Sequence, residues 1–393
     1  MPYLAPGVYI EENGFLPRSI QRAPTSAAVF IGPTLKGPIG GHAGSASPLT
    51  SYPDFERTYG RPADAGLSPG TVSALQAFAL SVRAFFGEGG SRLYVSRVPG
   101  QDPSTAEYVQ ALAATEAIED IAIVAAPGST ALASGPGRVN RPLEIARVLL
   151  AHVARPGAHR FAVLDTPPGL TVAQALSWRH QLNAVHAALY YPWVSSPGGS
   201  GDVWLPPSGS VCGIYARVDA RRGVHRAPAN EVVTGALRLE VNLDATQLEQ
   251  LNPAGVNGLR QVPARGIRVW GARTISSDPE WRYVSSRRLM TCIEASIQRS
   301  LRWVAFEPNS ERLWTEVQLS IETFLTQEWR AGALVGERPE QALFVRCGLG
   351  SMTQDDLDQG RLVCDMGVAL TRPSEFSIQR FVIRTASATG GRV

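Results

Sequence analysis

The stretch Arg160-Phe-Ala-Val-Leu-Asp165 decides the fold of this chain. Its four central residues are apolar without alternation, which is typical of a strand that is buried on both faces of a sheet. Apolar residues at helical spacing precede it over 143–153 and follow it over 172–189. A continuous apolar strand between two helices predicts a parallel sheet that is covered by helices on both sides.

The same alternation of apolar strands and amphipathic helices extends over residues 27–194. After residue 194 comes a loop rich in Ser, Pro and Gly, and this loop is followed by a segment that fits either a helix or a strand. The expected strands are 27–31, 92–98, 121–126 and 190–194, the expected helices are 71–86 and 104–118, the loop is 195–210 and the ambiguous segment is 211–219. We therefore expect an α/β domain over residues 26–262.

The last third of the chain has a different pattern. It opens on a strand with an outward arginine, continues with two long amphipathic helices and closes with three strands. These elements are expected at 267–271, at 286–304 and 310–329, and at 342–347, 362–370 and 376–385. Two helices followed by neighbouring strands predict an α+β domain over residues 263–375.

Both ends of the chain carry strands with no obvious local partner. The opening strand includes Val8, Tyr9, Ile10 and Glu11, and the closing one includes Phe376, Ile378, Phe381 and Ile383. We predict extended arms over 1–25 and 376–393. Such strands pair either with an edge in their own chain or with an edge on another molecule, and the pattern leaves both alternatives open.

Composition limits the function. The chain has 393 residues, of which 44% are hydrophobic and 18% charged, so it is expected to be globular with two or three domains. A net charge of +3 gives no reason to expect a nucleic-acid partner. No apolar run reaches the ~18 residues of a membrane span, and no signal-peptide pattern precedes Arg18, so we expect that the chain does not insert into a membrane and is not directed through one.

The four cysteines predict neither a metal site nor a disulfide. Cys212, Cys292, Cys347 and Cys364 are far apart and form no CxxC motif. Reduced thiols are the simpler expectation for a protein that is made in the cytoplasm.

Most nucleotide and hydrolase chemistry is excluded by missing motifs. Lys36 is the only lysine and precedes Gly37, whereas a P-loop needs a lysine before Ser or Thr. There is no GxGxxG after a strand, no HExxH and no GxSxG. We expect no cofactor and no metal.

One enzymatic alternative remains, an α/β hydrolase-like centre. Asp165 ends a predicted parallel strand, where α/β enzymes place functional groups. An Asp, His, Ser order can be drawn from Asp165 through two histidines of the next helix to three later serines, namely His180, His186, Ser196, Ser200 and Ser208. The alternative interpretation is that Asp165 begins a turn and the histidines are ordinary helix residues.

Several motifs carry a resemblance to a known family. The strongest is Pro263-Ala-Arg-Gly-Ile-Arg-Val-Trp-Gly-Ala-Arg-Thr-Ile275, which continues into Glu280-Trp-Arg-Tyr-Val-Ser-Ser-Arg-Arg-Leu289. Further matches are 3–12, 53–60, 85–95, 217–230, 306–314 and 371–376. With these motifs the chain resembles contractile tail sheath proteins of phage tails and of phage-tail-like injection systems. The segment from about 100 to 205 matches least.

The resemblance implies a structural subunit without catalytic activity. Such subunits stack helically around an inner tube, exchange strands through both termini, contract to drive the tube through a target envelope, and meet baseplate and tail-terminator proteins. Their middle sheet is described as subtilisin-like. A particle of this kind assembles in the cytoplasm and becomes part of a phage tail or related particle.

The resemblance also implies that the C-terminal region faces the tube. Arg287, Arg288, Arg299 and Arg302 on the first long helix are then candidates for contact with acidic tube residues. The alternative is a solvated helix face. A tail or baseplate adaptor that does not polymerise is the remaining alternative for the whole chain.

Overall fold

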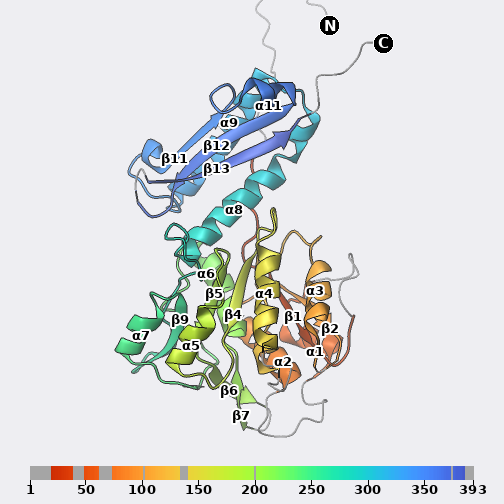
Figure 1. Ribbon diagram of the computed structural model, residues 1–393, viewed down its shortest axis with the longest axis vertical. Coiled ribbons are helices and arrows are strands. Elements are labelled where there is room, and N and C mark those ends of the chain that lie inside the picture. Colours follow the sequence, from red (N-terminus) through yellow and green to blue (C-terminus); the bar gives the residue numbers. More distant parts are fainter. Residues whose placement is uncertain are drawn as a thin grey trace, which may run out of the picture. The chain divides into compact units, whose positions relative to one another are not determined.

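The computed structural model describes residues 19–38, 48–61, 73–100, 102–132, 140–198, 201–372 and 375–385 (Figure 1). The chain divides into two compact units. The core unit is Arg22–Ala295, and the C-terminal unit combines Met1–Gln21 with Ser296–Val393. The sequence-based division after residue 262 falls between two strands that pair in one sheet, so the core unit extends beyond it.

A seven-stranded sheet forms the centre of the core unit (Figure 1). All neighbouring strands in it are parallel except β9 and β10 at one edge, which are antiparallel. In spatial order the strands are β10 (Gly266–Val269), β9 (Val256–Val262), β5 (Ala187–Tyr191), β4 (Phe161–Asp165), β3 (Ile123–Ala125), β1 (Ala28–Pro33) and β2 (Leu93–Val98). The predicted parallel-type sheet is confirmed.

Helices cover both faces of this sheet, which explains why its strands are apolar without alternation. One apolar core joins the sheet to α2 (Ala74–Gly87) and α6 (Ser208–Arg222), and α1 (Tyr52–Tyr59) packs at its side. A second core lies on the opposite face. It joins the sheet to α3 (Thr105–Ala113), α4 (Arg141–Val153), α5 (Val172–Arg179) and α7 (Ala245–Leu251).

Two local expectations are resolved by tertiary contacts. The predicted helix 172–189 ends at Arg179, because Ala187–Tyr191 forms β5 between β4 and β9. Pairing with two neighbours in the sheet outweighs the helical periodicity of that segment. The ambiguous segment 211–219 lies in α6, where Gly213 lets the helix approach α2: a Cβ there would lie 2.4 Å from the Phe85 carbonyl oxygen.

A small antiparallel sheet completes the core unit, with β6 (Val194–Gly198) between β7 (Gly201–Leu205) and β8 (Arg238–Leu239). Helix α8 (Val284–Ser300) begins in this unit and reaches Ser300. The expected helix 286–304 is thus α8 followed by a short 3-10 turn, Arg302–Phe306.

The C-terminal unit is an antiparallel sheet with one long helix, whereas two long helices were expected beside these strands; most of the first, α8, belongs to the core unit, which extends to Ala295. Its strands lie in the order β11 (Leu343–Cys347), β12 (Arg361–Ala369) and β13 (Phe376–Arg384). Helix α9 (Glu311–Arg330) packs on this sheet through Leu313, Val317, Ile321 and Phe324, and the short helices α10 (Pro339–Ala342) and α11 (Gln354–Asp358) flank the strands.

Candidate functional site

The C-terminal strand pairs within its own chain in this structure. β13 runs antiparallel to β12 over nine paired positions, from Arg361 opposite Arg384 to Ala369 opposite Phe376. Its other edge borders no strand among the described residues. A nine-residue strand at an open edge presents unpaired backbone groups that can accept another strand. The predicted N-terminal arm residues, Val8, Tyr9, Ile10 and Glu11, lie outside the described residues.

The predicted C-terminal arm residues fall on both faces of this sheet. Phe381 lies opposite Cys364, and Phe381 and Ile383 are half-buried. Phe376 and Ile378 lie on the other face, where Ile378 is 63% exposed and Val382 is 55% exposed. We call this second face, which carries Phe376, Ile378, Arg380 and Val382, the open face of the sheet.

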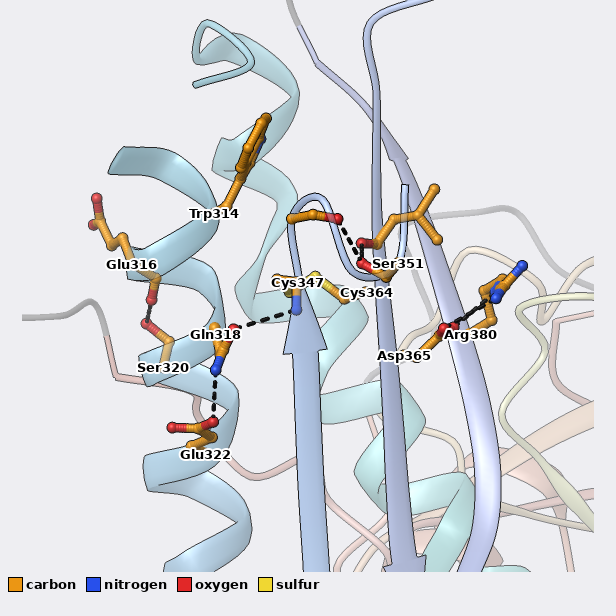
Figure 2. Close-up of a disulfide and its surroundings, with 12 residues drawn as sticks. Trp314, Glu316, Gln318, Ser320, Glu322, Cys347, Ser351, Cys364, Asp365 and Arg380 are labelled. Carbon is orange, nitrogen blue, oxygen red and sulfur yellow. Dashed lines mark hydrogen bonds and ion pairs between the residues drawn. A yellow bond between two sulfur atoms is a disulfide. The ribbon is translucent and has the colours of Figure 1, made fainter. Parts of the chain in front are cut away.

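The open face is ordered by side-chain contacts across the strands. The ring of Phe344 lies against Gly367, where a Cβ would be 2.1 Å from it, and meets Phe376 edge-on with 5.1 Å between ring centroids. Beside it, Arg380 binds both carboxylate oxygens of Asp365 at 2.7 and 2.9 Å (Figure 2). The face therefore combines exposed apolar groups with arginine.

A disulfide joins β11 to β12, which corrects the expectation of four reduced thiols (Figure 2). Cys347 and Cys364 are paired across the two strands, and their Cα atoms are 4.4 Å apart. Cys212 and Cys292 are buried free thiols. The bond closes the connection of residues 348–363, and Gln318 of α9 accepts a hydrogen bond from the Cys347 N–H at 3.3 Å.

A signal for this disulfide was present in the sequence. Cys347 ends one predicted strand and Cys364 lies near the start of the next, so antiparallel pairing of the two brings the thiols together. The expectation failed because it rested on cysteine spacing without considering strand register.

Arg287 and Arg288 are buried in the core unit and not on a solvated helix face. Arg287 stacks on Trp281, with 4.2 Å from the guanidinium carbon to the ring centroid, and binds Glu294 at 2.8 Å. Arg288 binds Asp219 at 2.6 Å, and both side chains are almost fully buried. Their charges are satisfied inside the unit, so we withdraw them from the tube-facing candidates.

The other two candidates lie nearer the surface. Arg299 is half-buried at the end of α8, and Arg302 is exposed at the start of the following 3-10 turn. Phe306, which ends that turn, is 83% exposed. Arg302 and Phe306 therefore put a cation and an exposed ring on the same short turn.

The structure brings Asp165 to Ser208 but to none of the predicted histidines. Ser208 donates two hydrogen bonds to the carboxylate, from N–H at 2.8 Å and from Oγ at 2.5 Å. Burial raises the pKa of Asp165 to about 7, against the effect of these bonds. Because Ser208 is the first residue of α6, Asp165 satisfies a backbone donor at the start of that helix.

The histidines lie at the wrong end of the sheet for a catalytic triad. β4 and β5 are parallel with Asp165 opposite Tyr190, whereas His186 precedes β5 at its other end. Burial, followed by the charge of Arg287, lowers the pKa of His186 to about 4. His180 is exposed at the end of α5, and Ser200 lies outside the described residues.

Neither a metal cluster nor a membrane-spanning helix occurs among the described residues. They include no group of three or more His, Cys, Asp or Glu side chains that could hold a metal ion. None of their helices combines the length and the apolar character of a bilayer span.

Comparison with known families gives two adjoining matches. Residues 101–275 match the phage tail sheath protein central domain, and residues 276–384 match the phage tail sheath C-terminal domain. Among curated relatives, the tail sheath protein of Burkholderia phage BcepMu is 26% identical over 197 residues, which are 44% of this chain and 40% of that protein. The chain matches its first curated relatives over only 35 to 40% of their length.

Solved structures resemble nearly the whole chain. The helical sheath of the anti-feeding prophage in its contracted state contains a chain 30% identical, with a TM-score of 0.74 and coverage of 97% of this chain and 99% of that chain. The contracted sheath complex of the extracellular contractile injection system PVC gives 29% identity, a TM-score of 0.74 and coverage of 97% and 98%. Both neighbours share this combination of a parallel-dominated sheet and antiparallel sheets.

Proposed function

This chain belongs to the contractile tail sheath family, and from that premise we propose that it polymerises around an inner tube by exchanging terminal strands and contracts to drive that tube through an envelope. The observation that carries the proposal is the likeness over 97% of the chain to a subunit of a contracted helical sheath. Part of the proposal is that the middle sheet is subtilisin-like and that the chain has no enzymatic activity.

The edge position of β13 supports strand exchange. β13 adds nine paired positions to β12 and carries Ile378 and Val382 on the open face. The same register can form between β12 of one copy and β13 of another, because the pairing depends only on backbone groups and on the facing side chains. Each backbone hydrogen bond contributes a net ~0.5–1.5 kcal/mol, so one arm supplies several kcal/mol.

Exchange through both termini makes the polymer stronger than any one contact. Each copy would lend residues 1–12 and β13 and would receive strands in return, so several contacts act together. Contraction then requires two packings of the same subunit, related by rigid-body rotation about the arms. Tube contacts would favour the extended packing, and burial between subunits the contracted one.

The proposed partners follow from this role. They are further copies of the chain, an inner tube protein met by Arg299 and Arg302, and baseplate and tail-terminator proteins. The related solved chains come from a baseplate and from contracted sheaths, which supports further copies of the chain and the baseplate as partners. Assembly in the cytoplasm, followed by incorporation into a tail-like particle, completes the proposal.

An engineered disulfide tests strand exchange directly. Val363 and Val382 face each other across β12 and β13, so cysteines at both positions can form a bond in that register. We expect non-reducing gels to show only intrachain bonds in dilute monomer and ladders of linked chains after polymerisation. Intrachain bonds alone in fully assembled polymer would contradict exchange of β13.

Deletion of residues 1–12 tests the other arm. Loss of one lent strand is expected to abolish or shorten the tubes seen by negative-stain electron microscopy, while the hydrogen-exchange protection of the core sheet stays unchanged. A truncated chain that polymerises and contracts like the intact one would show that the N-terminal arm is not exchanged.

A further inference from the structure

Exposed aromatic rings pair with arginines at two neighbouring places in the core unit. The guanidinium carbon of Arg260 lies 5.1 Å from the Trp270 ring centroid, and that of Arg273 lies 5.9 Å from the Tyr283 ring centroid. Trp270 is 41% exposed and Tyr283 is 43% exposed. We call these four residues the arginine–aromatic face.

The backbone holds the two pairs next to each other. The Trp270 N–H donates to the Gly258 carbonyl at 2.8 Å, and the Arg273 N–H donates to Asn257 Oδ1 at 2.7 Å. Asn257 and Gly258 are consecutive residues of β9, and Arg273 forms an antiparallel bridge with Tyr283. Both pairs are therefore anchored at one point of the sheet.

A pocket of about 240 Å³ opens beside Trp270. Ala245 and Leu248 of α7 line it with Trp270, and Glu249 is the one carboxylate in its lining. An apolar side chain of moderate size can enter such a space, with the tryptophan ring as one wall.

The arginines of this region have no carboxylate partner among the described residues. No ion pair or side-chain hydrogen bond reaches Arg260, Arg273 or the neighbouring exposed Arg282 there, whereas Arg287 and Arg288 on the next helix are both paired. A guanidinium that stacks on a ring keeps its in-plane N–H groups available for carboxylates. The face therefore fits an acidic protein segment with an apolar tip.

The C-terminal unit carries a segment with this chemistry. The connection between β11 and β12, residues 348–360, presents Leu349 at 68% exposure and an acidic helix, α11. Asp355 binds Arg361 at 2.8 Å. Asp358 accepts a hydrogen bond from the Gln354 side chain and pairs with no arginine among the described residues. The Cys347–Cys364 disulfide closes the base of the connection, which limits the entropy lost on docking (Figure 2).

Net charge favours the same pairing. The core unit has 25 basic and 20 acidic residues, whereas the C-terminal unit with the N-terminal segment has 12 basic and 14 acidic residues. Opposite charges on two different patches of one chain favour head-to-tail contact between copies.

We propose that the arginine–aromatic face of one copy receives the β11–β12 connection of a second copy, with Leu349 in the pocket beside Trp270 and Asp358 on the arginines. The inference rests on the proposed polymerisation. Because the two patches differ, each copy can give one and receive one, and the contact can repeat along a helical polymer.

A charge swap in the full-length chain tests this contact. Arg260→Glu with Arg273→Glu is expected to raise the critical concentration for polymerisation at least about tenfold, measured by sedimentation. Adding Asp358→Arg to that variant is expected to recover most of the loss. Arg147→Glu, one such charge reversal at an exposed position of α4, is the control and is expected to behave like wild type.

A second variant keeps the test independent of folding in the core unit. Leu349→Ser changes a largely exposed side chain in the other unit and is expected to weaken polymerisation by about threefold or more, because an apolar group leaves the pocket. Wild-type critical concentrations for both the Arg260/Arg273 variant and Leu349→Ser would overturn the inference while strand exchange stands. Failure of wild type itself to polymerise would instead overturn the proposed function, and this inference with it.

Discussion

The two sheets of this protein are built in opposite ways. The seven-stranded sheet of the core unit is covered on both faces, and its outer strands are bridged by other segments, at Leu49 for β2 and at Val232 for β10. The three-stranded sheet of the C-terminal unit is covered by α9, while in the described part of the chain β13 has one unpaired edge and the open face is exposed. The first sheet is complete within one chain, and the second offers an edge and a face to another molecule.

The difference between the two sheets indicates which parts of the molecule favour folding and which favour assembly. A closed parallel sheet gains its stability from apolar burial on both faces. An antiparallel sheet with a free edge gives up part of that burial and keeps backbone groups for pairing. Substitutions of residues buried in the closed sheet should therefore act on folding, and substitutions at the free edge and on the open face of the C-terminal sheet should act on assembly.

The largest effect is expected from the buried ion pair of the core unit. Arg288→Ala leaves Asp219 buried without a partner, which typically costs about 3–5 kcal/mol. Denaturant unfolding combined with hydrogen exchange should show the loss in the core sheet. Arg147→Ala, an exposed arginine of α4, is the control and should stay within about 0.5 kcal/mol. Equal stability of both variants would mean that the pair does not support the core.

The second effect depends on pH. The folded-state pKa of Asp165, about 7, lies above the ordinary value of 3.8, so the folded state binds the proton more tightly. The free energy of unfolding therefore includes a favourable contribution from protonated Asp165 at pH 4. This contribution decreases as the pH rises toward 7 and does not change further above that. Replacing Asp165 by Asn removes this titration, so the stability of the variant relative to wild type should rise by at most about 4 kcal/mol between pH 4 and 8.

Two histidines also titrate in this pH range, so the stability of Asp165→Asn has to be compared with that of wild type at each pH. Burial, with Arg160 or Arg287 nearby, lowers the pKa of His152 and of His186 to about 4, so their contributions increase as the pH rises toward 6.5. They titrate in both proteins and cancel in the comparison. Parallel stability curves for wild type and Asp165→Asn would show that Asp165 is ionised throughout.

The third effect belongs to the C-terminal unit. Replacing both Cys347 and Cys364 by Ser opens a loop whose ends are 17 residues apart, and loss of such a crosslink costs about 3 kcal/mol. Hydrogen exchange should become faster in β11 and β12 and stay unchanged in β4 and β5. A reductant should reproduce the change in wild type but leave the double variant unaffected. Equal hydrogen-exchange protection of β11 and β12 in wild type and in the double variant would show that these strands do not need the disulfide.

The same contrast explains how much the sequence could predict. The parallel sheet, its covering helices and the strands of the C-terminal unit follow from periodicity, because each element has an apolar face of its own. β5 (Ala187–Tyr191) was expected too late in the sequence, at 190–194, because pairing with its neighbours in the sheet, and not its own residues, decides where the strand begins. The burial of Arg288 was missed for a similar reason, since Asp219 lies 69 residues away and only the fold brings the two together.

The assembly sites were predicted in part. Phe376, Ile378, Phe381 and Ile383 lie on the expected strand, but only register separates the open face from the covered one. The disulfide also depends on register. Trp270 belongs to the 263–275 motif that carries the resemblance, but its pairing with Arg260 depends on the β9–β10 turn, which the motif does not reveal.

The smallest effect on folding should be the most informative about the open sheet. Ile378→Ser with Val382→Ser changes side chains that are 63% and 55% exposed, so the unpolymerised chain should lose no more than about 0.5 kcal/mol per site. If assembly covers the open face, the same pair should raise the critical concentration for polymerisation several-fold, because two apolar groups stay in water. Val109→Ser, at a residue of α3 that is 50% exposed, is the matched control in the closed unit. Equal critical concentrations for the two variants would show that polymerisation leaves the open face in water and uses only the edge of β13.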